Sequence, residues 1–136
     1  MAVIRKVDYY SMKVPNRPGA GSKLLDAMKA ADVNLLAFTG FPAGGGAQVD
    51  FVPKNRTAFL RAARKARLKI SARKAVFLVQ GADRVGALTG ILARLAAKRI
   101  SLTALDAVTA GQGRFGAMFW VKKRNVARAA RLLKAR

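Results

Sequence analysis

The 136-residue sequence contains no histidine, cysteine or glutamate, and its six acidic residues are all aspartates. Without imidazole, no side chain titrates near neutral pH unless its pKa is strongly shifted, which disfavours general acid–base catalysis. Without cysteine there is neither a disulfide nor thiolate chemistry, and most of the nitrogen and sulfur donors that transition metals prefer are missing. We therefore expect no catalytic residues, no metal site and no cofactor, and the chain is predicted not to be an enzyme.

Long apolar runs are also absent. No run approaches the roughly 20 residues that a membrane-spanning helix needs, and the segment before the first predicted strand is too short for a signal peptide. The absence of cysteine fits a reducing compartment. We expect a cytoplasmic protein without a membrane partner.

Negative charge is scarce, whereas 27 Lys and Arg residues give the chain a formal net charge of +21. A field of this size attracts polyanions or acidic surfaces, so a nucleic acid and an acidic protein are both candidate partners. The cations are concentrated in residues 54–74 and 122–136. The candidate nucleic-acid-binding residues are Arg61, Arg64, Lys65, Arg128 and Arg131.

The sequence repeats itself at an offset of 67 residues, which places Gly19 on Gly86 and Arg61–Arg64 on the identical segment Arg128–Arg131. This period is too long for a solenoid unit and suits a small α+β module used twice. We predict a first repeat over residues 1–69 and a second over 70–136. Because each module would be marginally stable alone, the two should fold together.

Apolar periodicity and turn residues predict the order of elements within a repeat. In the first repeat we expect strand 7–14, helix 18–31, strands 34–41 and 47–52 around a glycine-rich turn, helix 56–68 and strand 70–80. The last strand would end one repeat and begin the next. The predicted buried stripes of the two helices are Leu24, Leu25, Met28 and Ala31, and Phe59, Ala62, Ala63 and Ala66.

The element order, together with Asn16-Arg17-Pro18-Gly19 and Val33-Asn34-Leu35, resembles the ACT domain, a ferredoxin-like regulatory module. The resemblance covers nearly the whole chain as a tandem pair. It implies an α+β fold of two βαββαβ repeats that form one continuous, antiparallel-rich sheet with helices on one face. It also implies that a small effector, usually an amino acid, binds where the strand-to-helix turn of one domain faces the second strand of its neighbour.

Carried over by position, the resemblance gives the ligand-binding candidates of the first repeat as Asn16, Arg17, Pro18, Gly19, Ala20, Asn34 and Leu35. Their chemistry suits a carboxylate, because glycine lets a ligand approach the backbone and the N–H groups that open a helix carry partial positive charge. Turn chemistry explains the same residues equally well, with Asn16 capping the turn and Pro18 starting the helix.

The second repeat departs from this pattern. Its candidates are Asp83, Arg84, Gly86, Ala87 and Ser101, with no proline, and Asp83 replaces the amide of Asn16. Asp83 would repel a ligand carboxylate but could hold an ammonium group, or it could serve as a helix N-cap. We expect either one working site or two sites of unequal affinity.

Three further features have competing interpretations. Phe115 and Phe119 alternate on a predicted strand as do the base-stacking aromatics of the RNA recognition motif, but they also suit a core. Asp8 and Asp50 lie on neighbouring predicted strands and could hold a cation or be compensated by Lys or Arg. The strand that carries Phe119 and Trp120 is apolar on both faces, which predicts a homodimer that covers one of these two side chains.

The second repeat ends at its second helix and lacks a final strand, whereas the N-terminus is longer than one module needs. We predict that residues 2–6 supply the missing strand. Residues 2–14 and 69–81 would then pair antiparallel, with paired positions summing to roughly 82.

Overall fold

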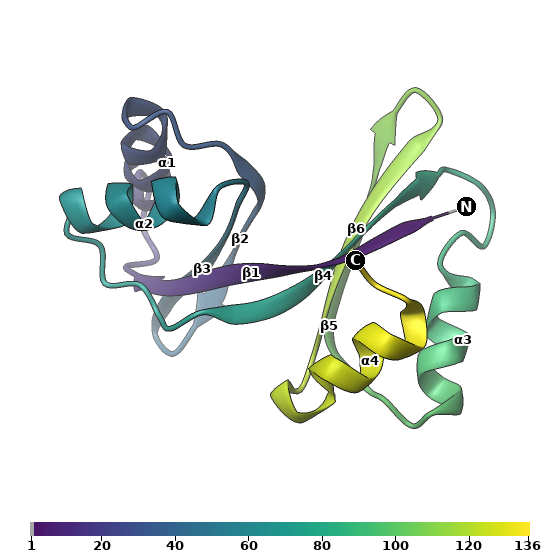
Figure 1. The fold of residues 1–136 in the computed structure, drawn as a ribbon. Coiled ribbons are helices and arrows are strands. Elements are labelled where there is room, and N and C mark those ends of the chain that lie inside the picture. Colours follow the sequence, from purple (N-terminus) through teal and green to yellow (C-terminus); the bar gives the residue numbers. More distant parts are fainter. Residues whose placement is uncertain (1) are drawn as a thin grey trace. The chain divides into compact units, whose positions relative to one another are not determined.

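The computed structural model describes residues 2–136, and its elements occur in the order βαββα, twice (Figure 1). The elements are β1 (Val3–Val14), α1 (Ala20–Ala30), β2 (Leu35–Ala43), β3 (Gly46–Pro53), α2 (Arg56–Lys65), β4 (Lys74–Ala82), α3 (Thr89–Ala97), β5 (Leu102–Gly111), β6 (Arg114–Val121), a 3₁₀ turn η1 (Lys123–Asn125) and α4 (Val126–Leu133). The strand order is β2-β3-β1-β4-β6-β5. This confirms the predicted α+β fold, with its two hairpins outside and two long strands inside.

The chain folds into two compact units that share β1. Residues 8–74 form the first-repeat unit, and residues 75–136 form the second-repeat unit together with the N-terminal segment up to Val7. Within the second-repeat unit, β1 neighbours β4, and Ile4 belongs to the unit's hydrophobic core. The N-terminal part of β1 therefore contributes a strand and a core side chain to the second-repeat unit.

Contacts at both ends of the inner strands agree with the predicted register. In the first-repeat unit, the Ser71 N–H donates to the Ser11 carbonyl at 2.8 Å, and these residue numbers match the predicted sum of roughly 82. In the second-repeat unit, a Cβ built on Gly81 would lie 3.2 Å from the Cα of Ala2.

The predicted strand 70–80 begins late, because residues 68–73 are irregular and β4 starts at Lys74. The Ser71 hydroxyl accepts the Ser11 N–H at 2.9 Å. The Ser71 hydroxyl thus accepts the hydrogen bond that a backbone carbonyl of the neighbouring strand accepts in a regular β-ladder.

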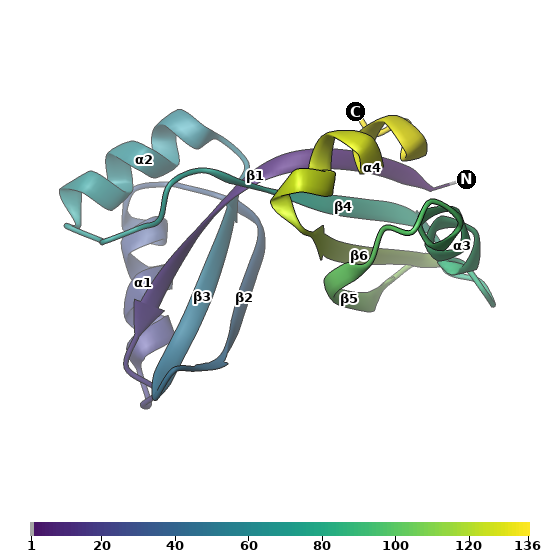
Figure 2. The same cartoon turned by 90° about the horizontal axis from the view of Figure 1, so that it is seen from below.

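The core of the first-repeat unit lies between its two helices and one face of its strands (Figure 2). Phe51 of β3 and Phe59 of α2 are fully buried, and their ring centroids lie 5.2 Å apart. The predicted helix stripes are confirmed at Leu24 and Met28 and at Phe59, Ala62 and Ala63, which are buried. They are wrong at Leu25, which is 41 % exposed, and at Ala31 and Ala66, which are exposed because α1 and α2 end one residue before them.

The core of the second-repeat unit repeats this arrangement with different aromatic residues. Phe77 of β4 stacks on Phe119 of β6 at 4.9 Å, and both are buried. Phe115 is also buried, so Phe115 and Phe119 form part of a core and do not offer the exposed stacking platform of the RNA recognition motif. Trp120 is only 9 % exposed. The reason given for a homodimer was wrong, because this chain already buries both Phe119 and Trp120. The homodimer itself stays a prediction.

All four helices end in the same way. A residue with positive φ follows each last turn: Asp32, Arg67, Arg99 and Lys134, with φ between 53° and 57°. The next N–H donates back across the turn, as from Val33 to Met28 and from Ile100 to Leu95. This is the Schellman arrangement, built here without the glycine that usually occupies the left-handed position. No helix among residues 2–136 is long and apolar enough to cross a membrane.

Candidate functional site

The strand-to-helix turn of the first repeat connects β1 to α1 through exposed residues 15–19. The Arg17 N–H donates to the Pro15 carbonyl at 3.1 Å, and the Ala20 N–H donates to the Arg17 carbonyl at 3.3 Å. Gly19 is the N-cap residue with φ +88°, and no side chain caps α1. Asn16 therefore does not cap this helix.

The conformation of Gly19 explains why glycine is needed at this position. A Cβ here would meet no atom of the chain within 4 Å, so glycine is not required by close packing against the chain. The positive φ does require it, because L side chains rarely adopt that conformation. The turn in this conformation leaves the N–H groups of Gly21 and Ser22 without an acceptor in the described part of the chain.

A small depression, the turn hollow, lies beside this helix end. It has a volume of about 220 Å³, and its walls include Asn16, Arg17, Ala20 and Gly21 from the turn and Phe41 from β2. The hollow thus combines a cation, an amide, a helix N-terminus and an apolar wall. Among the residues that the structure describes, Arg17 is the one charged residue that lines it.

Asn34 and Leu35 are not part of the turn hollow. They line a separate groove between α1 and β2, of about 420 Å³, together with Lys29 and Phe38. The structure therefore brings together Asn16, Arg17 and Ala20, but it does not bring Asn16 and Asn34 into one hollow of the first-repeat unit.

The turn of the second repeat has a different geometry. Helix α3 starts at Thr89, two positions later than the repeat offset predicts, after a turn in which Thr89 N–H donates to the Gly86 carbonyl. Val85, which replaces Pro18, is fully exposed. The expected N-cap role of Asp83 was wrong: the N-cap residue is Leu88, and no side chain caps α3. Because no proline presets a helical φ at position 85, α3 begins six residues after Asp83, too far along the chain for the Asp83 side chain to be the N-cap.

A larger depression, the cationic hollow, adjoins this turn. It has a volume of about 690 Å³, and Arg84, Gly86 and Ala87 line it. Ser101 does not line it and lies exposed just before β5. Sequence reasoning missed three of its cations: Arg94 of α3, and Lys134 and Arg136 beyond α4. Their positive charges were visible in the sequence, but their convergence was not.

Asp8 and Asp50 do not form a pair. Asp8 is half-exposed and lies 3.6 Å from Arg56, as the compensation interpretation predicts. Asp50 is buried and accepts hydrogen bonds from the Gln48 amide at 3.0 Å and the Thr39 hydroxyl at 3.3 Å. Neutral donors, not Lys or Arg, therefore compensate Asp50. In residues 2–136 no group of acidic residues could hold a metal ion.

Tyr10 is the titratable group with a shifted pKa in the first-repeat unit. Its ring stacks on Phe59 at 5.2 Å. Burial raises the pKa of the Tyr10 phenol above its ordinary value of 10.0, Asp8 acts in the same direction, and Arg56 and Arg73 oppose the shift. The neutral phenol is therefore the form that the folded state favours.

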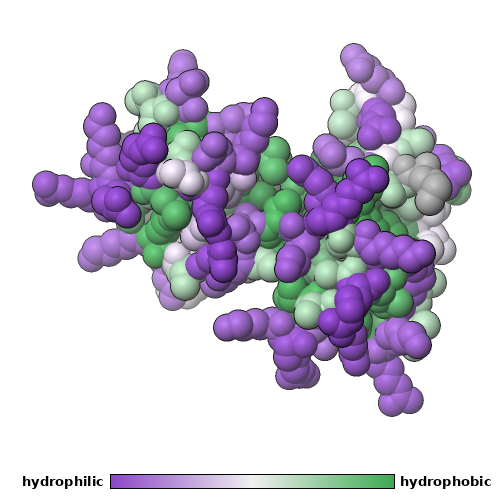
Figure 3. Space-filling model, viewed as in Figure 1, coloured by the Kyte–Doolittle hydropathy of each residue, from purple (hydrophilic) through white to green (hydrophobic). Residues whose placement is uncertain are grey.

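The helices that follow β3 and β6 present cations to solvent. Arg61, Arg64 and Lys65 of α2 are exposed, as are Arg128 and Arg131 of α4, and hydrophilic side chains cover much of the visible surface (Figure 3). Within the described residues, Arg56–Asp8 is the one ion pair. Most of the positive charge is therefore uncompensated.

Comparison with known proteins identifies the fold. Neither a scan against protein-family models nor a sequence search of curated proteins finds a match. A solved structure of a protein from Bacteroides thetaiotaomicron is similar, with a TM-score of 0.79 and 15 % identity over 98 % of this chain and 88 % of that one. The regulatory subunit of aspartate kinase from Thermus thermophilus aligns with a TM-score of 0.62 and 12 % identity over 98 % of this chain and 94 % of the other. Aspartokinase alpha and beta subunits align with a TM-score of 0.59 and 16 % identity, over 97 % and 93 %.

At these identities the likeness concerns the fold. The chain has the tandem ACT-like fold that its repeats predict.

Proposed function

We propose that this protein is a non-catalytic regulatory module that binds an amino acid or a related small effector in the turn hollow of the first repeat. The observation that carries the proposal is the hollow itself, in which Arg17 and the open end of α1 adjoin an apolar wall. A ligand carboxylate is stabilised by the free N–H groups and partial positive charge of a helix N-terminus. The regulatory subunit of aspartate kinase from Thermus thermophilus has the same fold, which supports a regulatory role.

The size of the turn hollow limits the ligand. At about 220 Å³ it is smaller than the roughly 300–1,000 Å³ typical of sites for drug-sized molecules. Phe41 and Val49 offer an apolar surface for a side chain, and the Asn16 amide can donate or accept a hydrogen bond. The proposed ligand is therefore a single amino acid and not a peptide.

A thermal-shift screen of the chain against the free amino acids tests the proposal. A ligand present at 100 times its dissociation constant should stabilise the folded state by about 2.7 kcal/mol. The matched variants are Gly21→Glu and Gly21→Gln, because a Cβ at Gly21 meets nothing within 4 Å and the two side chains differ mainly in charge. The Glu variant should lose the response and the Gln variant should largely retain it.

Arg17→Gln provides a second measurement at the same hollow and should weaken binding. If no amino acid stabilises the chain, or if Gly21→Glu responds as strongly as Gly21→Gln, the proposal fails.

A second candidate function, nucleic-acid binding, is favoured by one observation: the exposed cations of α2 and α4 have no acidic partners in the described chain. Replacing Arg61, Arg64, Arg128 and Arg131 by Gln should reduce RNA or DNA affinity and flatten its salt dependence, with little effect on folding. Unchanged affinity would exclude these helix faces, and binding of an acidic protein instead would assign the charge to that partner.

A further inference from the structure

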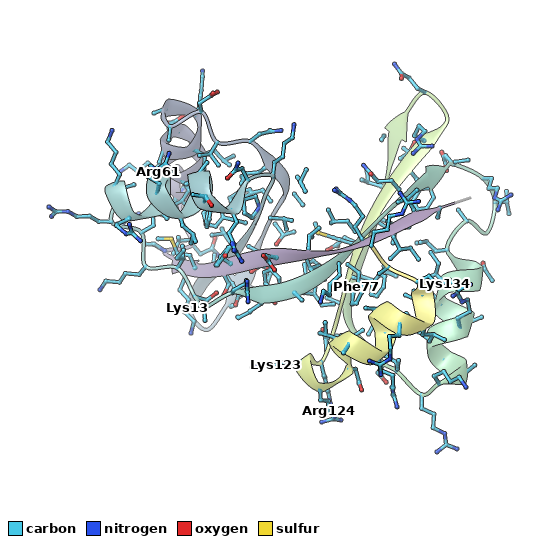
Figure 4. All side chains as sticks on the ribbon, in the orientation of Figure 1. Lys13, Arg61, Phe77, Lys123, Arg124 and Lys134 are labelled. Atoms are coloured by element: carbon cyan, nitrogen blue, oxygen red, sulfur yellow. The ribbon has the colours of Figure 1, made fainter. Side chains whose placement is uncertain are left out.

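The cationic hollow of the second-repeat unit gathers four positive side chains that are far apart in the sequence. Arg84 comes from the turn before α3, Arg94 from α3, and Lys134 and Arg136 from the segment after α4. Figure 4 shows Lys134 at the end of α4, near α3. No acidic side chain lines the hollow in the described chain. Four like charges around one depression repel one another, so a bound anion lowers the electrostatic energy of this part of the folded state.

Two of these cations are anchored. The Arg94 guanidinium donates to the Leu132 carbonyl in the last turn of α4, and it keeps further N–H donors for another acceptor. The Arg136 N–H donates to the Ile4 carbonyl at 3.0 Å, and its own carbonyl accepts the Lys6 N–H at 2.9 Å. The guanidinium of Arg94 and the backbone of Arg136 are therefore held in place before a ligand arrives, which lowers the entropic cost of binding.

The remaining lining of the hollow is apolar and open. The buried side chains of Ile4, Ile91 and Leu133 contribute to it. Gly90 of α3 also lines it, and a Cβ on Gly90 would meet nothing within 4 Å. At the repeat offset the first repeat has Lys23 in place of Gly90 and Ala27 in place of Arg94. The second repeat thus has free space where the first has a long side chain, and a cation where the first has none.

We propose that the cationic hollow binds a small phosphorylated organic ligand. The phosphate lies among Arg84, Arg94 and Arg136, since guanidinium groups bind phosphate oxygens through paired hydrogen bonds. The organic part of the ligand packs on the apolar lining. The volume of about 690 Å³ is within the range of roughly 300–1,000 Å³ that small-molecule sites occupy. A phosphate monoester carries more charge than one carboxylate and suits four cations better than an amino acid does.

This site does not depend on the amino-acid function proposed for the turn hollow. All its lining residues belong to the second-repeat unit, and none of them lines the turn hollow. The two proposals can therefore succeed or fail separately.

Calorimetric titration of the full chain at low ionic strength tests the proposal, with adenosine 5′-monophosphate, inorganic phosphate and adenosine as probes. We expect the monophosphate to bind more tightly than phosphate, and adenosine not to bind. Arg94→Gln should weaken monophosphate binding by about tenfold, the scale of one lost charge-assisted contact. Absence of monophosphate binding at millimolar concentration would overturn the site.

Arg124→Gln is the matched control. Arg124 is also an exposed arginine of the second-repeat unit, but it does not line the hollow. Its replacement removes the same charge and should change binding by no more than about twofold. Equal losses in the two variants would show that the ligand responds only to the overall field, and would overturn the site.

Gly90→Glu and Gly90→Gln test the hollow without removing any of its contacts. Both replace a helix glycine in open space, so both should fold. The Glu variant should abolish monophosphate binding, whereas Gln, with nearly the same volume, should reduce it less. Neither should alter the amino-acid response of the turn hollow. Equal binding by the Glu and Gln variants would contradict the proposed position of the phosphate.

Discussion

The turn hollow and the cationic hollow both adjoin a strand-to-helix turn, yet they differ in size and charge. The turn hollow is lined on one side by β2 and β3, and the cation in its lining is Arg17. The cationic hollow is bounded by α4 and the start of β1 and contains four cations. The two hollows also lie on different sides of their turns, because β2 and β3 line the first and α3, the segment after α4 and the start of β1 line the second. The two proposed ligands differ accordingly, an amino acid for the turn hollow and a phosphorylated compound for the cationic hollow.

The two repeats also complete their sheets differently. Ile4 and Ser71 occupy equivalent positions at the repeat offset. Ile4 lies in a regular strand and is buried in the core of the second-repeat unit. Ser71 lies in irregular chain and is attached to β1 by its backbone and its hydroxyl. The second-repeat unit thus has a buried apolar side chain at this position, whereas the first-repeat unit has a hydrogen-bonded serine and packs the neighbouring Ile70 against its core.

The largest expected effect is the loss of the Ile4 side chain. Ile4→Ala should lower the free energy of unfolding by about 2–5 kcal/mol, as truncations of buried aliphatic side chains do. Ser71→Ala, at the equivalent position, should cost only about 0.5–1.5 kcal/mol, the net value of a typical hydrogen bond. Urea denaturation of the full chain measures both. Val3→Ala is the control because Val3 is 39 % exposed, and an effect there as large as at Ile4 would contradict the closure by the N-terminus.

A smaller effect is expected at the helix ends. Asp32 and Arg99 follow α1 and α3 at equivalent positions, both in the left-handed conformation. Asp32→Gly relieves backbone strain and removes an anion from a helix C-terminus, so it should stabilise the chain by about 1 kcal/mol. Arg99→Gly relieves the same backbone strain but removes a cation that is favourable at a helix C-terminus, so it should stabilise the chain by less than Asp32→Gly does. Thermal denaturation distinguishes them, and the reverse ranking would exclude the electrostatic contribution.

The smallest effect concerns pH. Because the folded-state pKa of Tyr10 is raised, the folded state holds this proton more tightly than the unfolded chain does. The associated stability is fully present below the unfolded pKa of about 10 and is lost as pH rises through the folded value. Tyr10→Phe, which reproduces the second repeat's Phe77, should flatten the loss of stability above this pH. Denaturation curves at neutral and alkaline pH test this, and an unchanged alkaline slope would contradict the shift.

Much of the fold was predictable from particular residues. Gly44 and Gly45 lie in a two-residue turn with both φ values positive, 54° and 82°, so the glycine-rich segment specified a hairpin. Pro15 and Pro53 marked strand ends, and the 67-residue offset transferred the whole pattern to the second repeat. The late start of α3 was not predictable from the offset, because local turn bonds between residues 84 and 89 override the alignment.

The sequence by itself determined the repeated βαββα order and the apolar faces of the strands and helices, because these follow from the 67-residue offset and from apolar periodicity. Only the tertiary structure decided which of the candidate residues meet. It separated Asn16 from Asn34, and it brought Arg84, Arg94, Lys134 and Arg136 around one hollow. Convergence of this kind depends on how α3, α4 and β1 pack, and packing is set by side-chain contacts between distant segments that no local pattern records.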